Sequence, residues 1–256
     1  MKISVFSKSI TGYKNEIKNK GSQDYIFYEI SNNGVICAVA DGHSGDYFIF
    51  SSEGSQFACE ALIEVMGKYI KEESDYKLIK NLLENKKIQY EICSKWKQQV
   101  TSHYNKKLPC VYKIDYYRYG TTLLGMIVSN DYKLYLKLGD GDILINKDNV
   151  FTKIFPYKYT RLVNTLSERD AYNKFQYKIE KKNDNECFSA VMYSDGYDNS
   201  FSNFQSMSKD LEKTMRQYNK NIFTRFVLEK NYEKYLNKLS EEGSKDDISI
   251  VFVNIL

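Results

Sequence analysis

Acidic residues stand at the ends of several short apolar segments that are predicted to be β-strands. A strand end is a rigid support, so a carboxylate placed there is held in a fixed position. Carboxylates that lie close together repel one another unless a cation lies between them. Ligation by carboxylate oxygens alone favours Mg²⁺ or Mn²⁺ over Zn²⁺, which prefers cysteine and histidine. The acidic positions are Asp24, Asp41, Asp140, Asp195 and the pair Asp246-Asp247.

The most informative of these segments extends from Gly34 to Gly45. Residues 35–40 form a continuous apolar run rich in valine and isoleucine, which predicts a strand buried on both faces. The run ends in Asp41, Gly42 and His43, so a carboxylate and an imidazole directly follow the strand. An Asp-Gly pair also commonly makes a turn without any chemical role. This segment alone does not separate the two interpretations.

Six short motifs rich in aspartate and glycine are distributed along the chain. They are Gln23-Asp24, Asp41-Gly-His-Ser-Gly45, Gly120-Thr-Thr122, Gly139-Asp-Gly141, Ser194-Asp-Gly196 and Asp246-Asp-Ile-Ser249. In this order they resemble the motifs of metal-dependent protein phosphatases of the 2C (PP2C) type, and most of all the bacterial branch of that family. The resemblance covers 21–253, nearly the whole chain. Each motif alone is weakly specific, whereas six in order form a specific pattern.

The resemblance implies a set of ligands for two metal ions. Asp41 would bridge both ions, and the carbonyl oxygen of Gly42 would be a further ligand. Asp195 and Asp246 would each hold one side of the pair, and Asp24 would hold a metal-bound water.

Other acidic residues receive separate interpretations. Asp140 and Asp198 match positions that bind a third, weaker metal in bacterial relatives. Asp142 is predicted to be a turn residue. The choice of Asp246 over Asp247 rests on its spacing to the following strand.

The chemistry implied by the resemblance is hydrolysis of phosphoserine and phosphothreonine by a water that two Mn²⁺ or Mg²⁺ ions activate. His43 would protonate the departing seryl or threonyl oxygen, because an imidazole titrates near neutrality. Two other classes stay open from the residues alone. One is a catalytically inactive phosphoprotein-binding module, and the other is a structural protein that Ca²⁺ or Mg²⁺ stabilises.

Positive charge for the incoming phosphate is expected from the polar segment 11–21, which holds Lys14, Lys18 and Lys20. Eukaryotic relatives carry an arginine shortly before the acidic pair, but no arginine precedes Arg118 in this chain. We therefore predict that Lys18 or Lys20 binds the substrate phosphate. The same segment also fits a solvated loop without this role.

The remaining chain is predicted to position these groups in one α+β domain, 1–256. A helix starting near Ser55, a helical region from about Tyr76 to His103 and one or two helices over 206–239 carry apolar stripes. In the last region Ile222 and Phe226 are among the residues predicted to face inward.

Strands are expected over 3–6, 25–30, 120–128, 132–138, 143–145 and 247–256. The segments from 120 to 145 read as one antiparallel meander. Residues 146–185 look polar and irregular, with a short helix near 167–175, and the resemblance places a variable flap there. Grouped strands and grouped helices favour α+β. The resemblance implies an antiparallel β-sandwich with helices on both outer faces.

Composition and cysteine usage are typical of a soluble cytoplasmic protein. Of the 256 residues, 42% are hydrophobic and 27% are charged, and the net charge of +4 does not indicate nucleic-acid binding. The five cysteines are widely spaced, which predicts reduced thiols. No apolar run approaches the ~18 residues that span a membrane. The expected partners are a phosphoprotein substrate and a cognate serine/threonine kinase, and the chain is expected to be monomeric.

Overall fold

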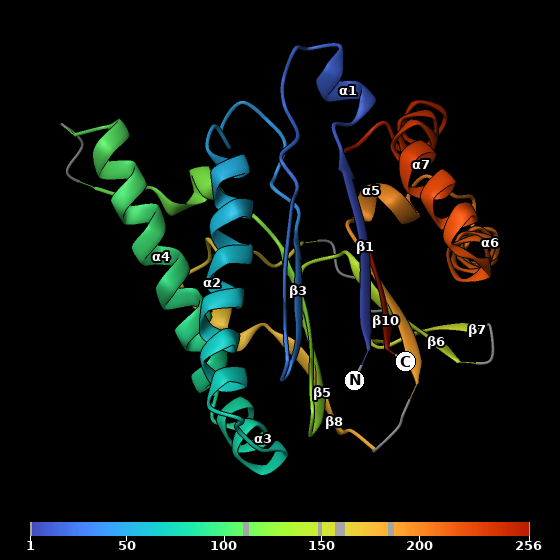
Figure 1. Ribbon diagram of the computed structural model, residues 1–256. Helices are drawn as coiled ribbons and strands as arrows, with labels where there is room; N and C mark the ends of the chain where they lie inside the picture. Colours follow the sequence, from blue (N-terminus) through green and yellow to red (C-terminus); the bar gives the residue numbers. More distant parts are fainter. Residues whose placement is uncertain (1, 110–112, 148–149, 157–161, 184–186, 256) are drawn as a thin grey trace.

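The computed structural model describes residues 2–109, 113–147, 150–156, 162–183 and 187–255. In this part of the chain, two five-stranded sheets pack face to face between two layers of helices (Figure 1). The first and last strands, β1 and β10, pair along their whole length. Both chain ends therefore lie at the same end of the sandwich (Figure 1). This arrangement confirms the predicted α+β class.

All strand pairings in the two sheets are antiparallel. One sheet has the order β1 (Ile3–Ile10), β10 (Ile248–Ile255), β9 (Phe188–Tyr193), β6 (Asp142–Lys147) and β7 (Val150–Lys153). The other has the order β2 (Tyr25–Ser31), β3 (Gly34–Ala40), β4 (Leu123–Ser129), β5 (Tyr132–Leu138) and β8 (Gln176–Lys181). Strand β3 is buried at every position, which explains its continuous apolar run.

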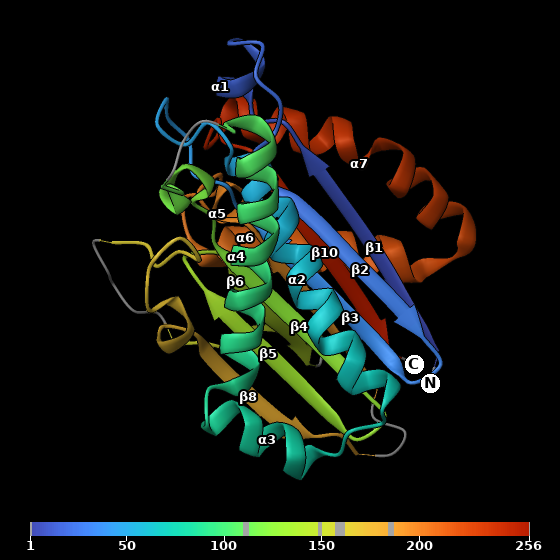
Figure 2. The same ribbon diagram turned by 90° about the vertical axis from the view of Figure 1, so that its left-hand side faces the viewer.

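Long helices cover the outer face of each sheet (Figures 1 and 2). On the β3 sheet these are α2 (Ser51–Lys71) and α4 (Lys87–Lys107), joined by α3 (Tyr76–Glu84). On the β10 sheet these are α6 (Phe204–Lys220) and α7 (Ile222–Glu242). The other helical segments are α1 (Tyr13–Glu16), α5 (Asp195–Asp198) and the 3₁₀ helices η1 (Tyr116–Tyr119) and η2 (Ala171–Asn173).

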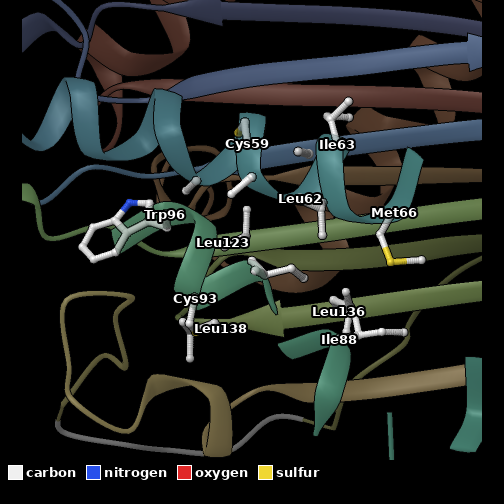
Figure 3. Packing of buried hydrophobic residues seen from close by; sticks show 14 of the residues in the cluster. Cys59, Leu62, Ile63, Met66, Ile88, Cys93, Trp96, Leu123, Leu136 and Leu138 are labelled. Atoms are coloured by element: carbon white, nitrogen blue, oxygen red, sulfur yellow. The ribbon is translucent and has the colours of Figure 1, made fainter. Parts of the chain in front are cut away.

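Apolar side chains fill the spaces between these layers. Trp96 of α4, Leu62 of α2 and Leu136 of β5 belong to one cluster of buried side chains between the helices and the sheet (Figure 3). The indole Nε1 of Trp96 donates a hydrogen bond to the carbonyl oxygen of Gly54 at 3.0 Å, so the buried ring leaves no unpaired donor. Burial of a large apolar side chain contributes about 1.5–3 kcal/mol. This packing fixes α2 and α4 on the sheet that carries Asp41.

The predicted hairpin of β4 and β5 is confirmed, but its predicted continuation into β6 is wrong. Strand β6 pairs with β9 and β7 in the opposite sheet. The chain crosses between the sheets at Gly139, which has a φ of +115° that L side chains rarely adopt. Apolar alternation predicts a strand but does not reveal which sheet the strand joins.

Several predicted boundaries also differ from the structure. Helix α2 begins at Ser51 rather than Ser55. The helical region from 76 to 103 is two helices, because Lys86 adopts a left-handed conformation with φ +60°. The Gln89 side chain donates to the carbonyl oxygen of Leu83 at 3.1 Å and satisfies the end of the first helix. Residues 146–185, predicted to be irregular, contain β7, η2 and β8.

The prediction that Ile222 and Phe226 face inward is wrong, since they are 86% and 62% exposed. Asn221 ends α6 and caps α7, where its side chain and that of Thr224 form a reciprocal capping box. The new helix therefore buries a different stripe, which includes Tyr232 and Leu236.

Three of the cysteines, Cys37, Cys59 and Cys93, are buried free thiols, whereas Cys187 is exposed. Cys110 lies outside the described residues. Within the described ranges, no helix has both the length and the apolar character that a membrane crossing requires.

Two glycines of α2 test how closely this helix packs. An added Cβ at Gly54 would lie 2.2 Å from the carbonyl oxygen of Tyr119, whereas at Gly67 the nearest atom is Cδ1 of Ile36 at 3.9 Å. Alanine normally stabilises a helix interior by about 0.5–1 kcal/mol relative to glycine. We expect Gly67→Ala to raise the free energy of unfolding in urea by about this amount and Gly54→Ala to lower it. Stabilisation by both substitutions would contradict the contact between α2 and η1.

Candidate active site

The structure brings acidic residues from both sheets to one end of the sandwich. Asp41 follows β3, Asp140 follows β5 and Asp195 follows β9. Each offers one carboxylate oxygen, and these oxygens lie within 4.8 Å of one another. Asp246, which precedes β10, lines one small cavity together with these three residues. The acidic residues that the sequence places at strand ends therefore lie together in the structure.

A small cavity of about 130 Å³ separates these carboxylates. Its other lining residues come from the loop after β3, the start of β4 and the segment before η2, and they are Gly42, His43, Ser44, Thr122 and Val163. Polar groups dominate this lining, in contrast to the apolar layers of the core. The space suits small ions and water.

Backbone hydrogen bonds hold Asp41 in position. The Asp41 N–H donates to Oγ1 of Thr122 at 3.0 Å, and the Thr122 N–H donates to the carbonyl oxygen of Asp41 at 2.9 Å. Oγ1 of Thr121 donates to the same carbonyl oxygen at 2.9 Å. The Gly-Thr-Thr motif therefore has a structural role. It holds Asp41 through its backbone and does not use the carboxylate, which can face the cavity.

Gly42 occupies a site where no side chain fits. An added Cβ would lie 2.5 Å from the carbonyl oxygen of Gln23 and 2.7 Å from that of Ser51. The Gly42 N–H donates to the Gln23 carbonyl oxygen at 3.1 Å. The chain can therefore pass close to the cavity only with glycine at this position.

Burial and mutual repulsion make this cluster electrostatically unfavourable by itself. Burial raises the pKa of Asp41 well above its ordinary value, and the charges of Asp24 and Asp195 raise it further. Burial also raises the pKa of Asp195, with Asp140 adding to the effect. A cation between the carboxylates would remove this penalty. An all-oxygen donor set of this kind fits Mg²⁺ or Mn²⁺.

Asp24 lies beside the cluster rather than on the cavity surface. Oγ of Ser194 donates a hydrogen bond to its carboxylate at 2.6 Å. Burial raises the pKa of Asp24 well above its ordinary value, and the charge of Asp247 adds to this effect. The residue is 7% exposed, so its carboxyl group must either be protonated or have its negative charge balanced by a nearby cation.

The geometry separates the roles of the two adjacent acids at the start of β10. The buried Asp247 carboxylate accepts hydrogen bonds from the N–H groups of Gly12 and Gln23, both at 2.6 Å, and from Nδ2 of Asn15 at 3.0 Å. These contacts attach the segment before β2 to the sheet. Asp246 instead lines the cavity, and its role as a metal ligand stays a prediction.

Asp198 and Asp142 lie away from the cluster. Asp198 lines a separate cavity with Phe204 and Lys153, and burial raises its pKa to about 7. The prediction that Asp142 is a turn residue is wrong. It is a buried residue of β6, and its carboxylate pairs with the amines of Lys137 at 3.2 Å and Lys153 at 2.7 Å.

His43 lines the same cavity as the acids. Its N–H donates to the carbonyl oxygen of Gly120 at 2.9 Å. Its ring packs edge-on against Phe48 with a centroid distance of 5.1 Å. Burial lowers the pKa of His43, and the charges of Asp140 and Glu168 oppose this effect. The imidazole is therefore held at the cavity by its backbone and by ring packing.

The lysines before β2 differ in their distance from the acids. Lys18 and Lys20 are exposed, and Nζ of Lys20 lies 3.4 Å from Asp46. Nζ of Lys14 instead contacts the Asp246 carboxylate at 2.6 Å. The sequence did not distinguish Lys14, since its position depends on a hydrogen bond from its N–H to the distant Lys245 carbonyl oxygen.

Comparison with known proteins agrees with this arrangement. The sequence profile of the family described as protein phosphatase 2C matches residues 11–237. No curated protein matches this chain.

Solved structures share the fold at low sequence identity. The catalytic domain of the serine/threonine protein phosphatase PstP, in complex with two manganese ions, is 14% identical over 99% of this chain and 98% of that chain, with a TM-score of 0.63. The serine/threonine phosphatase of S. agalactiae is 14% identical over 100% of both chains, with a TM-score of 0.60. RsbX in complex with magnesium is 15% identical over 99% of this chain and 96% of that chain, with a TM-score of 0.55.

The repulsion among the carboxylates predicts a metal-dependent change in stability. Mn²⁺ should raise the midpoint of thermal unfolding, and at 100 times its dissociation constant the gain is about 2.7 kcal/mol. Asp195→Asn removes one repelling charge, so the metal-free variant should be at least as stable as the wild type but should lose most of the Mn²⁺ response. Asp46→Asn, in an exposed loop, is the control and should keep it. An undiminished response in Asp195→Asn would exclude this residue as a ligand.

Proposed function

Because the chain belongs to the protein phosphatase 2C family, we propose that it hydrolyses phosphoserine and phosphothreonine in proteins in a metal-dependent reaction. The observation that carries this proposal is the group of three carboxylates, from Asp41, Asp140 and Asp195, with oxygens within 4.8 Å of one another. His43 lines the same cavity. Family membership identifies the reaction class, and the cavity supplies the groups that this class requires.

We propose manganese or magnesium as the cofactor, in agreement with the ions in the PstP and RsbX structures. Asp41, Asp195, Asp246 and the Gly42 carbonyl oxygen would hold two ions, and Asp24 would orient water beside them. Asp140, a member of the cluster, would hold a third ion, and Asp198 would have to reach this ion from the separate cavity that it lines. Divalent ions bound here would lower the pKa of a water and neutralise charge on the phosphoryl oxygens.

The side chains have distinct tasks in this proposal. The carboxylates fix the reacting centre at the end of the sandwich, while Thr121 and Thr122 keep Asp41 oriented through its backbone. His43 holds the proton that the departing seryl or threonyl oxygen requires. Lys18 and Lys20 supply positive charge at the rim, where a lysine acts as a point charge without the planar fork of arginine.

We also propose that the substrate is a phosphoprotein formed by a cognate serine/threonine kinase, and that the protein acts as a cytoplasmic monomer. The whole chain, 1–256, would form one catalytic domain. Gel filtration of the purified chain tests the monomer, since a dimer would elute at twice the mass of 30.0 kDa.

The decisive experiment measures Mn²⁺-dependent hydrolysis of p-nitrophenyl phosphate and of phosphoSer and phosphoThr peptides. Activity should be lost with EDTA and return with Mn²⁺ or Mg²⁺. Asp41→Asn and Asp195→Asn should each abolish it, because each removes a charge that would hold an ion. Full activity in EDTA would overturn the metal-dependent mechanism. Phosphopeptide binding without hydrolysis would instead indicate an inactive binding module.

His43 is tested by the leaving group of the substrate. A seryl or threonyl oxygen requires a proton in the transition state, whereas p-nitrophenolate does not. General acid catalysis contributes about 10²–10⁴-fold. His43→Ala should lose about this factor in kcat on a phosphoThr peptide and much less on p-nitrophenyl phosphate, with the Mn²⁺ dependence unchanged. Equal losses on both substrates would argue against the acid role.

The lysines are tested by separating substrate binding from metal binding. Lys18→Ala combined with Lys20→Ala should raise KM by about two- to fivefold, with a smaller change in kcat, because exposed charges contribute little each. Lys14→Ala is the comparison. Since Lys14 pairs with Asp246, its removal frees that carboxylate and should lower the Mn²⁺ concentration for half activation. An unchanged KM in the double variant would exclude Lys18 and Lys20.

A further inference from the structure

A second cavity of about 540 Å³ lies beside the candidate active site, between α4, η1 and the segment that precedes η2. In Figure 2 the yellow segment between β7 and β8 and the short green helix η1 lie on the same side of α4. Basic and aromatic side chains dominate the lining, and they include Lys97, Lys113, Arg169, Tyr116 and Tyr117. None of these residues belongs to the carboxylate cavity. We call this second cavity the basic pocket.

The acids among the described residues do not neutralise the charge of the basic pocket. Asp115 is the one acid among the described lining residues, and it pairs with Nε of Arg118 at 3.4 Å and accepts a hydrogen bond from the Tyr47 hydroxyl at 2.6 Å. Among the described residues, Lys113 and Arg169 form no ion pair with an acid. Both residues are exposed and line the pocket.

The acids nearest in sequence to Arg169 are also engaged elsewhere. Glu168 and Asp170 both pair with the amine of Lys174. The Lys97 amine donates to the backbone carbonyl oxygen of Arg169 at 3.3 Å, which joins α4 to the opposite wall without using an acid. The basic pocket therefore attracts negative charge from outside the molecule.

Two tyrosine rings contribute apolar contact surface to the basic pocket. The Lys97 amine lies 6.0 Å from the centre of the Tyr116 ring, and Tyr117 is 53% exposed. Tyrosine rings supply contact area at a low cost in conformational entropy. The combination of ring faces and cations suits an extended chain that carries carboxylates.

The walls of the basic pocket are continuous with the candidate active site. Leu166, next to the lining residue Ser167, donates its N–H to the carbonyl oxygen of Thr121 at 3.0 Å. Thr121 in turn bonds the carbonyl oxygen of Asp41. On the other wall, Asp115 bonds Tyr47 in the loop after His43. A peptide that leaves the carboxylate cavity on this side therefore meets the basic pocket.

We propose that the basic pocket binds aspartate or glutamate residues that flank the phosphorylated residue of the protein substrate. This proposal rests on the proposed phosphatase function and adds a substrate class to it. Carboxylates of the substrate would pair with Lys113 and Arg169, while its backbone lies on the tyrosine rings. The preference should weaken with salt, because exposed charges are screened.

The test uses a set of phosphoThr peptides that differ only in charge. An uncharged parent peptide is compared with peptides that carry two aspartates at increasing distances on either side of the phosphothreonine. The wild type should hydrolyse the best acidic peptide with a kcat/KM about five- to tenfold above the parent at low salt, mainly through KM. Lys113→Gln combined with Arg169→Gln should remove this preference.

The control is Lys77→Gln combined with Lys181→Gln. These exposed lysines line a cavity of about 670 Å³ at the opposite end of the sandwich, beside the turn between β4 and β5. This variant loses the same charge and should keep the preference. Hydrolysis of p-nitrophenyl phosphate should be unchanged in both double variants, because this substrate does not reach the basic pocket.

A binding measurement separates this proposal from the phosphatase function itself. A fluorescein-labelled, unphosphorylated version of the best acidic peptide should bind the wild type more tightly than the Lys113/Arg169 double variant in fluorescence anisotropy. Equal activity on acidic and uncharged peptides, or a preference that survives the double substitution, would overturn the proposal. An enzyme active on p-nitrophenyl phosphate that fails these tests would still be a phosphatase without this subsite. A stronger response to a second phosphate than to two aspartates would also overturn it.

Discussion

The repulsion among carboxylates at one end of the sandwich is the constraint on which the rest of the structure depends. Asp41, Asp140 and Asp195 have oxygens within 4.8 Å of one another, with Asp41 and Asp195 half-buried and Asp140 exposed. Like charges at this distance oppose folding, so neighbouring groups must hold them together. The buried strand β3 and the threonines beside Asp41 do so on one sheet. Asp247 does so on the other, because it attaches the segment before β2.

The positions of the acids could be predicted from sequence because they follow from local pattern. A continuous apolar run predicts a buried strand, and an acid that follows this strand must lie at the end of the sheet where the strand stops. Spacing favours Asp246 over Asp247 as a ligand; Asp246 lines the cavity, and its role as a ligand stays a prediction. The pairing of β6 with β9 and the contact of Lys14 with Asp246 could not be predicted in this way. Both depend on contacts between residues far apart in the chain.

The misassigned surface of α7 has a related cause. A single apolar stripe was extended across two helices, whereas the Asn221 cap starts a new helix with its own buried face. Periodicity describes each helix separately and carries no information about the angle between them. The basic pocket could not be predicted from local pattern either, because its cations come from three segments that are separate in the sequence. Residues 157–161 of the expected flap lie outside the described part of the chain.

Because the chain crosses between the sheets at Gly139, both sheets contribute carboxylates to the site. Asp41 and Asp140 are attached to one sheet, and Asp195 and Asp246 to the other. Side chains such as Val39, Met126 and Val253 separate the sheets and act as a spacer. The thickness of this spacer sets the gap between the two pairs of carboxylates. A change of one methyl group in this layer would therefore move the two pairs of carboxylates relative to each other and alter the fit of any ion between them.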